Sequence, residues 1–208
     1  MGGVWASLMA RLRALRVPVG LAASDSAMRT EEEAATPRPV PPDSEPTAPI
    51  EIDWLAELNA QLEAAGVVNF TAEELTFLPK AKPPRHDMPP RELWPNLIAV
   101  AKLAQQVRDL YGEPIWVSTG WRPDWYNAAV GGAKRSAHIK AGAVDLNVLP
   151  SRRNPTRTKK LEQACARVWT DDPTAKGMGV YRGARVHLDV IGRRRTWGQA
   201  QRVLGEMR

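Results

Sequence analysis

Two short segments, residues 142–148 and 185–191, alternate aliphatic and polar side chains with a period of two residues. Because successive side chains of a β-strand point to opposite faces, this alternation predicts two strands that each bury one face. The aliphatic residues would form the buried face: Val144, Leu146, Val148, Val186, Leu188 and Val190. If the strands are neighbours, Asp145, His187 and Asp189 share the opposite face.

Helical patterns precede these strands. Residues 53–66 are amphipathic and end at Gly66, a residue type that favours helix C-termini. Thr71 and Glu74 have the spacing of a capping box, which indicates a helix start. A long amphipathic helix is expected from Asn96 to a stop at Gly112.

The rest of the chain alternates short strands with helices. The expected segments are a strand at 114–120, a strand at 142–150, a helix at 157–169, two strands within 177–191 and a last short helix within 197–208. A tight turn at Arg182 and Gly183 would join the last two strands. Helices followed by a small sheet predict the α+β class, with a small antiparallel sheet packed against helices.

Three regions are expected along the chain. Residues 1–21 have the pattern of a basic amphipathic helix, suited to docking on a larger assembly or a membrane surface. Its arginines interrupt the apolar region, so it makes a poor signal peptide. Residues 22–50 are rich in proline and predict a disordered linker. Residues 51–208 would form the folded domain.

Composition limits the possible functions. Residues 151–208 contain 14 Lys and Arg against five Asp and Glu, a net charge of +9. The total net charge is +6, so residues 1–150 carry −3. Such a basic region favours either a polyanionic partner or simply a solvated surface. No nucleic-acid motif is present, so no specific nucleic-acid partner is expected. The lone Cys165 excludes an intramolecular disulfide and a thiolate metal cage, and we expect it to be buried and inert.

His138 lies on a glycine-containing loop just before the first of the two alternating strands. It could fold back over Asp145 and His187, which would bring together two imidazoles and one carboxylate. Three protein ligands with one open position are the pattern of catalytic zinc, whereas structural zinc fills all four positions. The alternative is an ordinary histidine–aspartate pair on the surface.

Two longer stretches extend this pattern: "STGWRPDWYNAAVGGAKRSAHIKAGAVDLNV" and "GMGVYRGARVHLDVIGRRRTW". Together they resemble the zinc D-Ala-D-Ala carboxypeptidase and murein endopeptidase family, in the branch whose last motif is His-x-Asp. The resemblance covers roughly residues 70–197. Trp121 stands where tyrosine is usual in the family, and residues 141–143 match its Gly-x-Ala motif only in part.

The resemblance implies one Zn²⁺ held by His138, Asp145 and His187. An acidic residue often lies three positions before the last ligand in the wider family, but this chain has Ala184 there. Asp189 is therefore the expected general base, with a role as metal ligand left as an alternative.

Two further residues receive expected roles from the resemblance. Arg122 would polarise the scissile carbonyl or bind a substrate carboxylate, since its planar guanidinium suits either oxygen group. Ser136 would orient a ligand or the substrate.

The implied substrates are peptidoglycan stem peptides or cross-links, which places the expected activity at the cell wall or periplasm. Without a convincing signal peptide, delivery by a phage or virion is a possible route. The alternative function is a non-catalytic wall-binding or virion structural module on the same fold.

Overall fold

The structure is a computed structural model that describes residues 53–183 and 185–207. These residues belong to one compact unit, Pro49–Arg208. The expected N-terminal helix (1–21) and proline-rich linker (22–50) lie outside the described residues. None of the helices in the described part of the chain combines the length and apolar character needed to cross a membrane.

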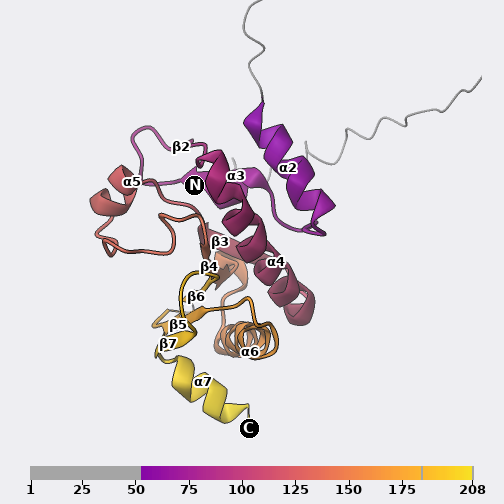
Figure 1. Ribbon diagram of the computed structural model, residues 1–208. Coiled ribbons are helices and arrows are strands. Elements are labelled where there is room, and N and C mark those ends of the chain that lie inside the picture. The colour runs from indigo at the N-terminus through magenta and orange to yellow at the C-terminus, as the bar shows by residue number, and fades with distance from the viewer. Residues whose placement is uncertain (1–52, 184, 208) are drawn as a thin grey trace, which may run out of the picture. The chain divides into compact units, whose positions relative to one another are not determined.

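A five-stranded sheet carries the alternating segments (Figure 1). Its strand order is β3 (Ile115–Thr119), β4 (Ala143–Val148), β6 (Arg185–Asp189), β5 (Gly177–Tyr181) and β7 (Arg195–Gly198). The first four strands pair antiparallel, whereas β7 lies parallel to β5. The prediction of an α+β fold with a small antiparallel sheet is confirmed, and β7 adds one parallel pair.

Helices supply most of the remaining structure. They are α2 (Trp54–Ala64), α3 (Ala72–Thr76), α4 (Trp94–Tyr111), α5 (Asp124–Ala129), α6 (Pro155–Asp171) and α7 (Ala200–Glu206), with 3₁₀ turns at Arg91–Leu93 and Pro150–Arg152. A separate two-stranded sheet joins β1 (Phe77–Leu78) to β2 (Arg85–His86). Both α4 and α6 pack against the large sheet, and α2 packs on α4.

The helix ends follow local rules. Gly66 has a φ of 81° and its N–H bonds back to Glu63, which closes α2 as expected. The capping box of Thr71 and Glu74 is present at the start of α3. Gly112, with a φ of 75°, ends α4 as predicted, but α4 begins at Trp94 because Pro95 is tolerated in a first helical turn.

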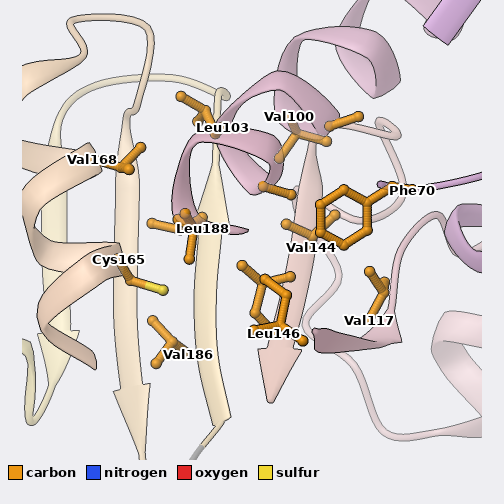
Figure 2. Close-up of a cluster of buried hydrophobic side chains, with 14 of the residues drawn as sticks. Phe70, Val100, Leu103, Val117, Val144, Leu146, Cys165, Val168, Val186 and Leu188 are labelled. Carbon is orange, nitrogen blue, oxygen red and sulfur yellow. The ribbon is translucent and has the colours of Figure 1, made fainter. Parts of the chain in front are cut away.

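The aliphatic faces of β4 and β6 form the centre of the core (Figure 2). Val144, Leu146, Val186 and Leu188 are fully buried and Val148 nearly so, as predicted for the apolar face, whereas Val190 is only partly buried. Cys165 is also fully buried there, and burial raises the pKa of its thiol. The apolar face of the sheet is thus covered by helices, so the polar face is the one that can carry a site.

The last short helix expected within residues 197–208 is present as α7. The strand β7 at residues 195–198 was not predicted, and it takes the first two residues of that segment, Trp197 and Gly198, into the sheet. Trp197 pairs with Gly179 of β5, so the aromatic side chain belongs to the sheet.

Candidate metal centre

The register of β4 and β6 places Asp145 directly opposite His187. The Nδ1 atom of His187 lies 3.0 Å from Oδ1 of Asp145. Both side chains project from the face opposite the helix-covered core, as the alternation predicted.

His138 reaches the same carboxylate from the loop that precedes β4. Its Nε2 atom lies 3.4 Å from Oδ1 of Asp145, and its ring centroid is 5.0 Å from that of His187. Backbone hydrogen bonds hold this loop in place, including one from Arg122 N–H to the carbonyl of His138. One ligand atom from each of the three residues lies within 4.8 Å of the others.

The outward nitrogens of both imidazoles are committed to hydrogen bonds. Nδ1 of His138 lies 2.7 Å from the carbonyl oxygen of Gly120, which can only accept, so this nitrogen donates. Nε2 of His187 lies 3.0 Å from a carboxylate oxygen of Asp189 and donates to it in the same way. In the neutral rings, Nε2 of His138 and Nδ1 of His187 therefore carry lone pairs that face Asp145.

This donor set fits a divalent cation. Two imidazole lone pairs and a carboxylate oxygen converge on one point, an arrangement that a metal ion would stabilise. In a tetrahedral zinc site with bonds of about 2.0–2.1 Å, ligand atoms lie roughly 3.3 Å apart. The observed 3.0 and 3.4 Å separations from Oδ1 of Asp145 are close to that value.

Burial and pairing set the protonation of the three residues, each less than a tenth exposed. Burial lowers the pKa of His138, which favours the neutral ring that a metal needs. Burial opposes ionisation of Asp145, but hydrogen bonds to the two imidazoles outweigh it and lower the pKa of Asp145. Burial also opposes protonation of His187, but hydrogen bonds to Asp145 and Asp189 outweigh it and raise the pKa of His187.

Asp189 is fully buried on the same face of β6. Its Oδ2 accepts from His187 and, at 2.8 Å, from Arg195; its Oδ1 accepts from Arg195 at 3.2 Å and from the Ile191 N–H at 3.0 Å. The carboxylate lies over Gly177, where an added Cβ would come within 2.0 Å of Oδ2. Asp189 does not line the pocket described next.

A pocket of about 570 Å³ opens over the three residues. Arg122 and Ser136 both line it, as the expectation of substrate contacts requires. The guanidinium of Arg122 donates to Oδ2 of Asp145 at 3.2 Å, and burial lowers its pKa. The hydroxyl of Ser136 accepts from the N–H of His138 at 3.3 Å, so it also stabilises the ligand loop.

Two functional neighbours were missed in the sequence, Arg195 and Trp197. The ring of Trp197 packs against His187 with centroids 5.0 Å apart and lies over Gly179, where an added Cβ would be 2.3 Å from the ring. Both residues lie on β7. The parallel pairing of β7 with β5 is a long-range contact that no local sequence pattern reveals. The two glycines in "GMG" were the available signal, since glycine within a strand often marks a close approach by another group.

A buried histidine–aspartate–histidine group below a pocket, on an α+β fold, is the arrangement of a single-metal hydrolase. A family model described as peptidase M15 matches residues 68–189, which include all three candidate ligands. The chain belongs to this family, that of the zinc D-Ala-D-Ala carboxypeptidases, and the resemblance seen in the sequence is confirmed. No curated protein sequence shows a significant match to the chain. Membership supports a zinc peptidase in general terms.

Proposed function

We propose that this protein hydrolyses peptide bonds of peptidoglycan stem peptides or cross-links with one Zn²⁺ held by His138, Asp145 and His187. The observation that carries the proposal is the convergence of three buried ligand atoms within 4.8 Å, in a chain of the peptidase M15 family. A pocket above these atoms gives a peptide access to them.

Zinc is the proposed ion because two imidazoles and one carboxylate are a common ligand set of catalytic zinc. A bound zinc ion would supply Lewis acidity to the scissile carbonyl and to water. The remaining chemistry belongs to side chains of the chain itself.

Arg122 is the proposed catalytic contact. Its hydrogen bond to Oδ2 of Asp145 fixes the guanidinium beside the metal centre while the side chain still lines the pocket. A guanidinium has five N–H donors, so others remain available for a substrate oxygen. There it would stabilise negative charge that develops on the scissile carbonyl oxygen during attack.

The contacts of Asp189 favour positioning of His187 over general-base catalysis. A general base must come within hydrogen-bond reach of the proton that it takes. Both oxygens of Asp189 already accept two hydrogen bonds each, and the side chain is fully buried outside the pocket lining. Asp189 instead holds the Nε2 proton of His187, which leaves Nδ1 for the metal.

The proposed place of action is the cell wall or periplasm, with residues 1–21 as the proposed contact with a larger assembly or a membrane surface. Family membership and the peptide-sized pocket support the wall substrate. Secretion of the tagged chain from cells tests whether residues 1–21 direct its export.

Replacement of His138 or Asp145 by alanine tests the proposed function. We expect each variant to lose bound zinc, measured by inductively coupled plasma mass spectrometry, and to lose at least a hundredfold in muropeptide release from purified sacculi. His86→Ala is the matched control, since His86 is exposed on β2 and does not line the pocket. Unchanged zinc content and unchanged release in the His138 and Asp145 variants would reject the proposal.

A further inference from the structure

The pocket over the metal centre is strongly cationic. Five basic residues line it, whereas its one acidic lining residue is the candidate ligand Asp145 (the basic ones are Lys80, Arg122, Arg135, Arg185 and Arg195). Arg195 is paired with the buried Asp189, and Arg122 with Asp145. A divalent cation would add further positive charge. Such a pocket favours an anionic ligand.

Arg185 is the basic lining residue that an aromatic ring holds in place while its contact with a carboxylate is a long one. It lies on β6 two residues before His187, so both side chains share the open face of the sheet. Its nearest carboxylate oxygen is Oδ2 of Asp145, at 4.0 Å. That oxygen already accepts a hydrogen bond from Arg122 at 3.2 Å, and 4.0 Å is too long for a second one from Arg185.

Stacking holds Arg185 in place without using its donors. The guanidinium carbon lies 4.3 Å from the ring centroid of Tyr181, the cross-strand partner of Arg185 on β5. A guanidinium that stacks on an aromatic face keeps the N–H groups at its edges available. The side chain is 45% exposed and lines the pocket, so these donors are accessible to a ligand.

We infer that Arg185, stacked on Tyr181, forms a subsite for a carboxylate of the substrate beside the scissile bond. The planar fork of a guanidinium matches a carboxylate with two parallel hydrogen bonds. This subsite and the metal centre open into the same pocket. A carboxylate bound by Arg185 would therefore lie within about one residue of the bond that is cut. This inference rests on the proposed function and deepens it, because it specifies acidic peptides as the substrates.

The carboxylate has two possible sources, a peptide side chain or the peptide C-terminus. Three synthetic stem peptides separate them: a parent with both carboxylates free, one with the side-chain carboxylate amidated and one with the C-terminus amidated. Steady-state cleavage of each by the zinc-loaded protein gives kcat and KM. For the wild-type protein, kcat/KM should be about tenfold or more lower on one of the two amidated peptides than on the parent. That peptide lacks the carboxylate needed for one charge-assisted hydrogen-bonded pair with Arg185.

Variants assign that preference to Arg185. In Arg185→Gln, KM for the parent peptide should rise about tenfold with little change in kcat, and cleavage of the discriminating amidated peptide should stay at the wild-type rate. Arg185→Lys keeps the charge without the fork and should be intermediate. Arg182→Gln is the control, since Arg182 is exposed on the β5–β6 turn and does not line the pocket.

Two results would overturn the inference: equal cleavage of all three peptides by the wild-type protein, or an unchanged preference in Arg185→Gln. If the wild-type protein cleaves none of the peptides, the proposed function fails while the subsite remains testable. Calorimetric binding of the same peptides to the zinc-loaded protein then decides. Weaker binding of the parent peptide to Arg185→Gln than to wild type supports the subsite, and equal binding rejects it.

Discussion

The substitution Asp189→Asn removes a charge without changing the shape of the side chain, and it separates the two roles considered for this residue. Each carboxylate oxygen accepts two hydrogen bonds, from His187 and Arg195 at Oδ2 and from Ile191 and Arg195 at Oδ1. An asparagine amide has one oxygen and one NH₂ group. Whichever way it turns, its NH₂ faces two donors that lose their acceptor.

The magnitude follows from this count. A buried donor without a partner costs about 1–3 kcal/mol, and Arg195 is partly exposed and can recover water, so we expect a loss of about 2–4 kcal/mol in unfolding free energy. For a domain of this size that corresponds to a fall of about 5–15 °C in Tm. Zinc affinity should fall about 10–100-fold, because His187 faces either an NH₂ group or a neutral amide oxygen in place of the carboxylate that fixes its tautomer.

Calorimetric zinc titration, thermal unfolding and muropeptide release measure the three consequences on the same preparations. Asp171→Asn is the matched control, because Asp171 forms an exposed ion pair with Arg167 on α6 and should cost less than about 1 kcal/mol. If Asp189→Asn bound zinc with wild-type affinity but lost hydrolysis, positioning of His187 would be refuted and Asp189 would act as the general base.

Three further predictions concern the metal centre and the core. Zinc should raise the Tm more at pH 8 than at pH 6. The pKa of His187 is raised on folding, so its proton stabilises the fold fully below about pH 6.5, and this stabilisation is lost as pH rises through the folded pKa. The bound proton competes with zinc for His187, so the competition is weaker at pH 8; equal increments in Tm at both pH values would contradict this. Gly179→Ala should destabilise the fold by about 1–3 kcal/mol and alter tryptophan fluorescence, because the new Cβ meets the ring of Trp197. The control Gly205→Ala on α7 places its Cβ in open space and should be neutral or slightly stabilising. Equal stability of the two variants would show that Trp197 does not pack over Gly179. Cys165 is fully buried with a raised pKa, so a water-soluble thiol reagent should label it only after denaturation, and rapid labelling of the native protein would contradict its burial.

The parts of the fold that local patterns encode were predictable. The two-residue alternation identified β4 and β6 and their buried faces, and the glycine and capping signals identified the ends of α2 and α4 and the start of α3. The pairing of Asp145 with His187 followed from the same alternation, once the two strands were taken as neighbours.

The parts that depend on distant contacts were not predictable. The parallel strand β7 pairs with β5 through long-range backbone bonds, so the segment around Arg195 showed only a cluster of positive charge. Asp189 shares a face with His187, which suggested a general base or, alternatively, a metal ligand. Its actual environment depends on Arg195 and on the space over Gly177, neither of which the strand pattern reveals.

The central claim is that His138, Asp145 and His187 bind one zinc ion. Anomalous diffraction at the zinc absorption edge, from crystals of the zinc-loaded protein, tests it most directly. We predict a single strong peak about 2.0–2.2 Å from Nε2 of His138, a carboxylate oxygen of Asp145 and Nδ1 of His187. A zinc peak elsewhere, or no peak between these three side chains, would contradict the account.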